Sequence, residues 1–299
     1  MEDLLRIDSI DAYNRLYGFE TRHPLVTVVD LSKATRWVSR ARFHYGVYAL
    51  YLKDVKCGNI KYGRKNYDYQ DGTIVCFAPG QAVDVERTDN VKPAGYGILF
   101  HPDLIHGTAL GQEIKNYSFF SYETSEALHL SKEERNTILD CLRKIDVELN
   151  RSIDKHSRRL INSNIGLLLD YCMRFYDRQF VTRSEANSDI VTRFEQLLND
   201  YFDGDAPARE GLPTVKYFAD KVFLSPNYFG DLISRHTGIT ASEHIQNKVV
   251  GQVKEQLLST NKTTSQIAYE LGFQYPQHLS RMFKRVAGMT PNEYRSSGA

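Results

Sequence analysis

An internal repeat of 50 residues is the feature that most constrains what this chain can fold into. When residues 225–244 are aligned with residues 275–294, identical residues fall on five matching positions. The matched pairs are Pro226 with Pro276, Arg235 with Arg285, Gly238 with Gly288, Thr240 with Thr290, and Glu243 with Glu293. Apolar residues match between the copies as well. Each copy therefore predicts a helix that begins near its proline and ends at its glycine.

A second, shorter helical segment precedes each copy, at residues 214–223 and 264–273. A short helix, a tight turn and a longer helix form the helix-turn-helix outline, whose second helix enters the major groove of DNA. In the second copy Gly272 lies at the turn, whereas the first copy has Phe223 and Leu224 there and is one residue shorter. The repeat therefore predicts two helix-turn-helix motifs.

The stretch between the two motifs predicts one connecting helix over residues 242–259, with Ile245, Val249, Val253 and Leu257 on one face. A helix of that length spans about 27 Å at a rise of ~1.5 Å per residue. Recognition helices held about one DNA turn apart, ~34 Å, can enter successive major grooves on one side of the duplex. A generic helical bundle is the alternative to this interpretation.

Charge is distributed unevenly along the chain. Residues 212–295 carry ten Lys and Arg and six Asp and Glu, a balance of +4, although the whole chain is only +1. The remainder therefore carries −3. A basic C-terminal part beside an acidic N-terminal part favours nucleic acid as a partner, though many solvated helical faces reach the same charge.

The N-terminal half predicts short strands rich in β-branched and aromatic residues, separated by Gly and Pro turn signals. These strands are predicted at residues 25–31, 43–52, 73–79, 82–87, 95–100 and 117–123. Several short strands at this spacing are typical of a barrel or a sandwich, and a barrel of this size can hold one small ligand.

Two helices are predicted after the strands. Ser131 and Glu134 form a capping-box pattern that opens the first, and a second follows at about 154–180. Both have apolar stripes, led by Ile138 and Leu142 in one and by Ile161 in the other. The stripes can pack on the strands, or they can pair across a two-fold axis in a dimer, and a wide stripe can do both.

The segment 181–189 is polar and lacks an apolar period, so we expect it to link two domains. The expected domains are residues 1–180, with a sensor and dimerisation role, and residues 190–299, with a DNA-binding role. Within the second domain, residues 203–213 predict a loop.

The C-terminal segment 266–295 closely resembles the signature of AraC/XylS-type transcription regulators. The residues that carry the resemblance are Ile267-Ala268, Gly272-Phe273, Phe283-Lys284, Gly288, Thr290-Pro291 and Tyr294-Arg295. The resemblance extends over about 110 residues, from Ile190 to the end, when the first motif is included. It implies seven helices, two helix-turn-helix motifs and sequence-specific binding of DNA.

The N-terminal half resembles the sensor part of such regulators, a cupin-like barrel followed by helices, on its architecture and on the segment 71–83. The expected fold class is therefore α+β: a cupin-like β-barrel with dimerisation helices, then an all-α domain with two helix-turn-helix motifs joined by a linker helix. Cupin enzymes hold a metal through a His-x-His pair, and this sequence has none. Because His44, His101 and His106 are isolated, we expect no metal and no cofactor.

Candidate DNA contacts follow from the exposed face of each recognition helix. In the second motif these are Gln277, His278, Ser280, Arg281, Lys284 and Arg285, with Leu279, Met282, Phe283 and Val286 facing the core. Gln277 and Arg281 share a face and can pair with adenine and guanine, whereas Lys284 and Arg285 are expected to meet phosphate. In the first motif the candidates are Asn227, Tyr228 and Arg235. Gly230 costs helix stability there, and Asp231 would repel phosphate unless it accepts from a cytosine amino group, so this motif is expected to bind DNA weakly or to read its shape.

These observations together predict a transcription regulator and no enzyme activity. The expected partners are double-stranded promoter DNA, an unknown small-molecule effector at the barrel, RNA polymerase if the protein is an activator, and a second copy in a homodimer. One alternative is an effector-blind regulator whose barrel is only a dimerisation scaffold; another is a metal-dependent cupin enzyme targeted to DNA. We expect a cytoplasmic location, because no apolar run approaches the ~18 residues of a membrane span and the four cysteines (Cys57, Cys76, Cys141, Cys172) are scattered.

Overall fold

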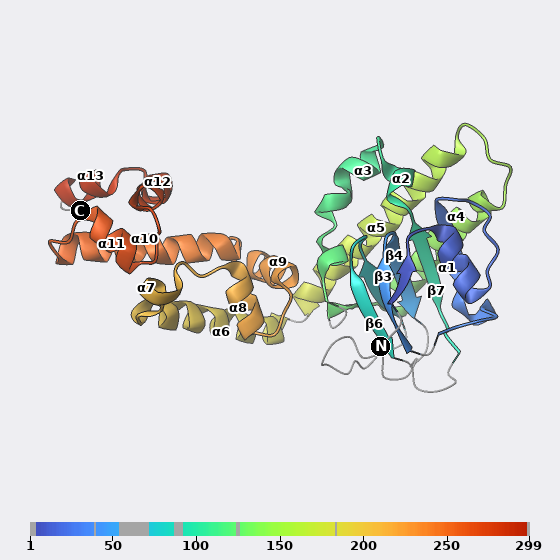
Figure 1. The fold of residues 1–299 in the computed structure, drawn as a ribbon, viewed down its shortest axis with the longest axis horizontal. Coiled ribbons are helices and arrows are strands. Elements are labelled where there is room, and N and C mark those ends of the chain that lie inside the picture. The colour runs from blue at the N-terminus through green and yellow to red at the C-terminus, as the bar shows by residue number, and fades with distance from the viewer. Residues whose placement is uncertain are drawn as a thin grey trace. The chain divides into compact units, whose positions relative to one another are not determined.

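The chain folds into two compact units, residues 1–182 and residues 183–299. The computed structural model describes residues 4–38, 40–53, 72–86, 92–123, 126–182 and 184–297, so Cys57 lies outside the described residues. All the described strands belong to the N-terminal unit, and the described part of the C-terminal unit is helical (Figure 1). The predicted α+β class is therefore confirmed. Among the described residues, no helix combines the length and the apolar character needed to cross a membrane.

The described strands of the N-terminal unit form two sheets. The first has the order β1 (Leu4–Ile7), β3 (Arg40–Tyr45), β6 (Ala82–Glu86), with β1 parallel and β6 antiparallel to β3. The second is antiparallel and has the order β2 (Val26–Asp30), β7 (Tyr96–Phe100), β4 (Tyr48–Lys53), β5 (Thr73–Phe77), β8 (Leu128–His129). No ladder among the described strands joins the two sheets, so the predicted closed barrel is not confirmed.

One predicted strand, residues 43–52, is in fact two strands that belong to different sheets. The chain leaves β3 at Tyr45 and enters β4 at Tyr48. Gly46 makes this break possible, because a Cβ there would lie 2.9 Å from the Asp8 carboxylate and 3.0 Å from the Asp8 Cα. Its N–H donates to the Ile7 carbonyl at 2.9 Å, which ties the break to the end of β1.

Aromatic side chains fill the space between the two sheets. Phe43 and Tyr45 come from the first sheet and Tyr51 and Phe77 from the second, and all four are buried. The Tyr45 and Phe77 rings stack at 5.1 Å, and the hydroxyls of Tyr45 and Tyr51 lie 3.4 Å apart. Burial raises the pKa of Tyr51 well above its ordinary value, since the phenolate would be desolvated there. The inter-sheet space is thus a packed core.

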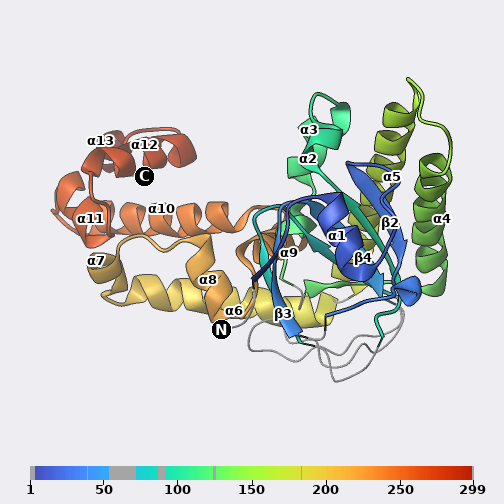
Figure 2. The same ribbon diagram turned by 45° about the vertical axis from the view of Figure 1, so that its right-hand side comes forward.

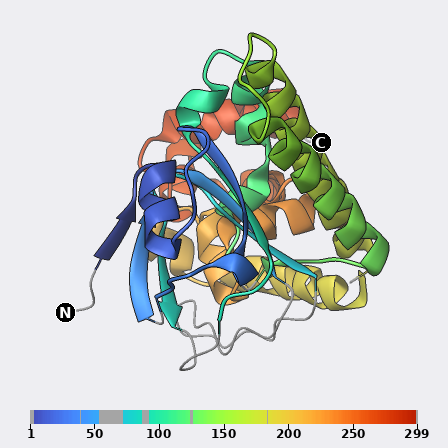
Figure 3. The ribbon, with the colours of Figure 1, turned by 90° about the vertical axis from the view of Figure 1, so that its right-hand side faces the viewer.

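Two long helices, α4 (Lys132–Leu149) and α5 (Ser157–Thr182), pack together and contact strands β2 and β8 of the second sheet (Figures 2 and 3). Strand β5 lies between β4 and β8, contacts the 3₁₀ helix Ser118–Ser121, and is buried along its whole length. The predicted apolar stripes point inward, with Ile138, Leu142 and Ile161 all at most 2% exposed. The capping box of Ser131 and Glu134 is present as expected.

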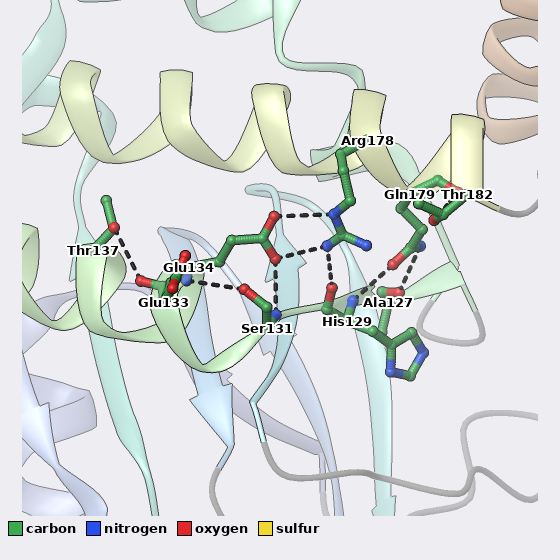
Figure 4. A network of polar contacts seen from close by, with 9 residues as sticks. All are labelled: Ala127, His129, Ser131, Glu133, Glu134, Thr137, Arg178, Gln179 and Thr182. Atoms are coloured by element: carbon green, nitrogen blue, oxygen red, sulfur yellow. Dashed lines mark hydrogen bonds and ion pairs between the residues drawn. The ribbon is translucent and has the colours of Figure 1, made fainter.

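Arg178 near the end of α5 ties three elements together (Figure 4). Its guanidinium donates to both carboxylate oxygens of Glu134 at 3.0 and 2.8 Å, and to the His129 carbonyl at 2.6 Å. The next residue, Gln179, pairs with β8 through its side chain, accepting from the His129 N–H at 2.8 Å and donating to the Ala127 carbonyl at 3.2 Å. A bidentate pair of this kind fixes orientation, so the last turns of α5 are anchored to α4 and β8.

The predicted strand at residues 117–123 is wrong: this segment forms a short 3₁₀ helix over Ser118–Ser121. Its aromatic side chains do not alternate between faces, because tertiary packing buries all of them. Phe119 stacks on Tyr176 of α5 at 5.5 Å, and the Tyr117 hydroxyl donates to Asp170 at 2.8 Å. Short helices make up the rest of this unit: α1 (Ile10–Tyr17), α2 (Pro102–Ile105), α3 (Ala109–Glu113) and the 3₁₀ turns Leu31–Lys33 and Ile114–Asn116.

The C-terminal unit contains eight helices over its described residues 184–297, one more than the resemblance implies. They are α6 (Ser184–Asp203), α7 (Ala206–Glu210), α8 (Val215–Lys221), α9 (Pro226–Thr237), α10 (Ala241–Ser259), α11 (Thr264–Glu270), α12 (Pro276–Ala287) and α13 (Pro291–Ser297). The additional helix, α7, lies in the predicted loop 203–213. Residues 184–189 of the predicted linker form the beginning of α6.

Candidate nucleic-acid interface

Both copies of the repeat fold as predicted, into helices α9 and α12. Each begins with its proline in the first turn, where the missing N–H costs nothing. Each ends at a left-handed glycine, Gly238 with φ 79° and Gly288 with φ 78°. The N–H groups of the two glycines donate to Ser234 and Lys284 at 2.9 Å. The matched prolines and glycines of the repeat are therefore the start and stop signals of two equivalent helices.

The turns before these helices share one hydrogen bond despite their different sequences. The Leu224 N–H donates to the Ala219 carbonyl at 3.0 Å, and the Phe273 N–H donates to Ala268 at 2.9 Å. The residue before each donor is left-handed: Gly272 at φ 85° and Phe223 at φ 60°. A bulky residue in this region costs about 1–2 kcal/mol relative to glycine. The first motif (α8–α9) therefore carries strain that the second (α11–α12) avoids.

Helix α10 connects the two motifs as predicted. Its 19 residues span about 28 Å at a rise of ~1.5 Å per residue. Ile245, Val249, Val253 and Leu257 are buried, and α10 contacts α6 and α9 of the first half as well as α11, α12 and α13 of the second. One helix thus supports both motifs.

The matched Thr and Glu residues of the repeat are explained by capping. The Thr240 N–H donates to the Glu243 carboxylate at 2.7 Å at the start of α10, and the Thr290 N–H donates to Glu293 at 2.7 Å at the start of α13. These backbone hydrogen bonds, with those from the two threonine hydroxyls, lower the pKa of both carboxyls. Each motif is therefore followed by a helix that a charged capping box stabilises.

Acid is expected to destabilise the C-terminal unit through these two caps. Because the folded-state pKa lies below the ordinary glutamate value of 4.5, the carboxylates contribute stability above that pH and lose it as the pH falls below 4.5. The melting temperature of the E243Q/E293Q variant should lie below that of wild type near pH 7, and the difference should close in acid. A difference that does not change with pH, followed by circular dichroism, would contradict this.

Helix α12 presents most of its predicted contact residues to solvent. Gln277, His278, Arg281, Lys284 and Arg285 are exposed, and Ser280 is half-buried with its hydroxyl donating to the Pro276 carbonyl at 3.3 Å. Leu279 and Phe283 are fully buried, as predicted. Val286, predicted to face the core, is instead 39% exposed, because it falls at the edge of the stripe set by Leu279 and Phe283.

Two neighbours of this face were missed by sequence reasoning. Gln246 of α10 accepts a hydrogen bond from the Arg285 guanidinium at 2.8 Å, so one of the hydrogen-bond donors of Arg285 is already occupied. Tyr275, 54% exposed, lies against His278 with 5.4 Å between ring centroids. Tyr275 could have been found from the sequence, because it directly precedes the recognition helix. No local sequence pattern indicated that Gln246 would lie beside Arg285.

Helix α9 presents a different face. Asn227 and Arg235 are exposed as predicted. Tyr228, predicted as a contact residue, is only 5% exposed, so its predicted place on the solvent face is wrong. The buried set of α9 is two residues wide and includes Tyr228 beside Phe229, whereas the equivalent His278 of α12 is solvated. The first motif uses the Tyr228 ring as core.

The two recognition faces also differ in charge. Positions equivalent under the repeat pair Asp231 with Arg281 and Ser234 with Lys284, while Arg235 and Arg285 are alike. The α12 face therefore carries three cations, whereas the α9 face carries one cation and one anion. Since phosphate attraction supplies much of the affinity for DNA, the second motif is the stronger candidate for tight binding.

Gly230 allows the role of the α9 face to be measured. A Cβ at Gly230 would meet nothing within 4 Å, and the same holds for Gly251 in α10. Alanine at either position should stabilise the protein by about 1 kcal/mol, because glycine is a poor helix former. If the α9 backbone approaches DNA closely, G230A should weaken DNA binding while the matched control G251A leaves it unchanged. Equal DNA affinity of the two variants would show that α9 makes no close approach there.

The described residues offer no group of three or more His, Cys, Asp or Glu side chains arranged to hold a metal ion. His101 Nδ1 accepts from the Asp103 N–H at 3.2 Å and so caps α2, and His106 lies 3.2 Å from the Asp103 carboxylate. His44 lies on β3. His101 and His106 therefore both lie beside Asp103, whereas His44 is on a different element.

Comparison with known proteins shows that the C-terminal unit is similar to helix-turn-helix domains. Residues 218–297 match a protein family described as "Helix-turn-helix domain". The uncharacterized transcriptional regulatory protein YesN of Bacillus subtilis is 32% identical over 143 residues, which are 46% of this chain and 37% of that protein. The probable transcriptional regulator LumQ of Photobacterium leiognathi is 28% identical over 240 residues, covering 78% of this chain and 86% of LumQ.

Among solved structures, the C-terminal domain of AraT, a response regulator from Geobacillus stearothermophilus, is 27% identical and superposes with a TM-score of 0.32. That match covers 36% of this chain and 84% of the solved one. The chain spans between about a tenth and just over half of the length of the first three curated relatives it matches.

Proposed function

We propose that this chain is a transcription regulator of the AraC type whose C-terminal unit binds promoter DNA through both helix-turn-helix motifs, as the match of residues 218–297 to a helix-turn-helix family and the regulators among its relatives support. The proposed division of labour is that of the sequence prediction: residues 190–299 bind DNA, and residues 1–180 sense a signal and dimerise. In this proposal the protein is located in the cytoplasm. The free, buried thiols of Cys76, Cys141 and Cys172 support that location, because a reducing compartment keeps thiols unpaired.

The solvent face of α12 carries this proposal. Gln277 and Arg281 lie one turn apart on the N-terminal half of the helix, where a recognition helix contacts base edges. Arg281 pairs with guanine and Gln277 with adenine, while Lys284 and Arg285, further along, meet phosphate. In the first motif, Asn227 and Arg235 are the contact residues. The connecting helix α10, about 28 Å long, suits recognition helices that occupy successive major grooves.

Selection of DNA from a random pool by the purified full chain tests this function. We expect enrichment of one motif with two half-elements about one turn apart. Enrichment of a single half-element would restrict base recognition to α12, in keeping with the neutral face of α9. Failure to enrich any sequence, with and without cell extract added as a source of effector, would contradict the proposal.

A small-molecule effector, in this proposal, binds outside the packed inter-sheet core. A cavity of about 330 Å³ lies between the edge strand β2 and helix α4, with Val28, Tyr96 and Leu142 in its walls and Arg22 and Arg143 among its polar residues. The cavity has the size of a small-ligand pocket. The alternative is that the N-terminal unit binds no effector and is a dimerisation scaffold, and the aromatic filling of the inter-sheet space favours it.

The proposed homodimer forms through the outer face of α4 and α5. Val147 and Leu160 are each 46% exposed and Leu167 is 39% exposed, and the first two line the same surface groove. Leu160→Glu should convert a dimer to monomers, because it places a charge in an apolar contact without disturbing the core. Sedimentation equilibrium measures the change. Equal masses for wild type and variant would place the dimer contact elsewhere.

RNA polymerase becomes a further partner if the regulator activates transcription.

A further inference from the structure

Helix α7 bridges the two halves of the C-terminal unit. The first half comprises α6, α8 and α9, the second comprises α11, α12 and α13, and α10 runs through both. Helix α7 is a second connection between the halves, because it contacts α6 of the first half and α11 of the second (Figures 1 and 2). The segment 205–211, which contains α7, is called the clasp below.

The clasp meets the second motif backbone to backbone. A Cβ built on Gly272, in the turn of that motif, would lie 2.4 Å from the Pro207 carbonyl oxygen and 2.6 Å from the Gly211 carbonyl carbon. Only glycine permits this approach, and Pro207 is buried. The clasp is therefore seated directly on the turn that positions α12.

The other end of the clasp is fixed to the first half. The Tyr201 hydroxyl of α6 donates to the Gly211 carbonyl at 2.7 Å. Tyr201 is itself 5% exposed, and its ring makes an edge contact with Tyr217 of α8 at 5.2 Å. The same carbonyl group is thus held by the first half and touches the second.

We infer that the clasp determines which spacing between two half-elements the protein accepts. The inference rests on the proposed function. With α10 alone, bending of a single helix could change the distance and angle between α9 and α12. A second connection away from the α10 axis opposes that bending. Since one DNA turn of ~34 Å holds about 10 base pairs, one inserted pair moves a half-element by about 3.4 Å and rotates it by about 35°. A rigid pair of motifs cannot follow both changes.

The test compares DNA affinities over a series of spacings. The probe is the selected DNA with its two half-elements at the original spacing and with one base pair added or removed. In the clasp variant, residues 205–210 are replaced by a Gly-Ser sequence of equal length. The matched control, R209S/E210S, changes two exposed clasp side chains, neither of which lies among the close contacts at Gly272. Circular dichroism checks the helix content of each full-length protein.

Wild type and the R209S/E210S control should lose at least tenfold in affinity when the spacing changes by one base pair. The clasp variant should bind the original spacing several-fold more weakly and lose less than threefold on changed spacings. Retention of the wild-type discrimination would overturn the inference, and so would a wild type that is indifferent to spacing. If the clasp variant does not fold, Tyr201→Phe removes only the hydroxyl bond and should relax the discrimination partly; unchanged discrimination would overturn the inference. A wild type that binds none of the probes would refute the proposed function itself.

Discussion

Replacing Gly272 by alanine is expected to destabilise the C-terminal unit by about 3 kcal/mol. Two effects add. The left-handed backbone, at φ 85°, costs alanine about 1–2 kcal/mol. The new Cβ would also lie 2.4 Å from the Pro207 carbonyl oxygen and 2.7 Å from the Gly211 Cα, so backbone on both sides must shift. Forced expansion of a packed contact costs a further 1–3 kcal/mol or so.

Gly288 provides the matched control for this prediction. It has nearly the same backbone conformation, φ 78°, but a Cβ there would meet nothing within 4 Å. Gly288→Ala should therefore cost only the conformational part, about 1–2 kcal/mol. Urea unfolding followed by circular dichroism measures the free energy of unfolding of both variants. An unchanged dependence of that free energy on urea concentration checks that the same surface is exposed on unfolding. Equal losses for the two variants would mean that the clasp does not press on the turn.

Replacing Arg281 by alanine is expected to weaken binding to the selected DNA by about 1–3 kcal/mol and to relax preference at one base pair. Arg281 is exposed and lies one turn after Gln277 on the N-terminal half of α12. A bidentate contact to guanine accounts for a loss of this size and for its dependence on one position. Competition binding against single-base variants of the DNA measures both effects.

Arg285→Ala is the matched control within the same helix. Because the Arg285 guanidinium already donates to Gln246 at 2.8 Å and lies further along α12, we expect a smaller loss that is similar for all sequences. If R281A also lowers affinity uniformly, Arg281 contacts phosphate. If R281A leaves affinity unchanged, Arg281 does not belong to the interface.

The spacing of apolar residues and the residues that start and end helices made the C-terminal unit largely predictable. The proline and glycine at the ends of α9 and α12, and the capping pairs that follow them, act within a few residues of each other, so the sequence repeats their signals directly. The additional helix α7 was not predictable in this way. It has five residues, contains a proline and ends at Gly211, which is the composition of a loop. Its order comes from contacts with Tyr201 and Gly272, which are distant along the chain.

Packing between distant segments also explains the errors in the candidate site and in the N-terminal unit. Tyr228 has the composition of a surface contact, yet the wide core of the first motif buries it. The aromatic residues of 117–123 resemble a strand, but Tyr117 and Phe119 are held by Asp170 and Tyr176 of α5. Five of the six predicted segments contain strands, but β1 and β8 were not predicted, and the division of the strands into two sheets depends on the break at Gly46.

Hydroxyl-radical footprinting of the full-length protein on its selected DNA tests the central claim most directly, because it records where both motifs meet the sugar-phosphate backbone. We predict that each bound protomer protects two patches on one face of the duplex, centred about 10 base pairs apart. Both should disappear together as salt is raised, since Lys and Arg contacts release counterions. No protection at any salt concentration, or protection spread evenly around the duplex, would contradict the account.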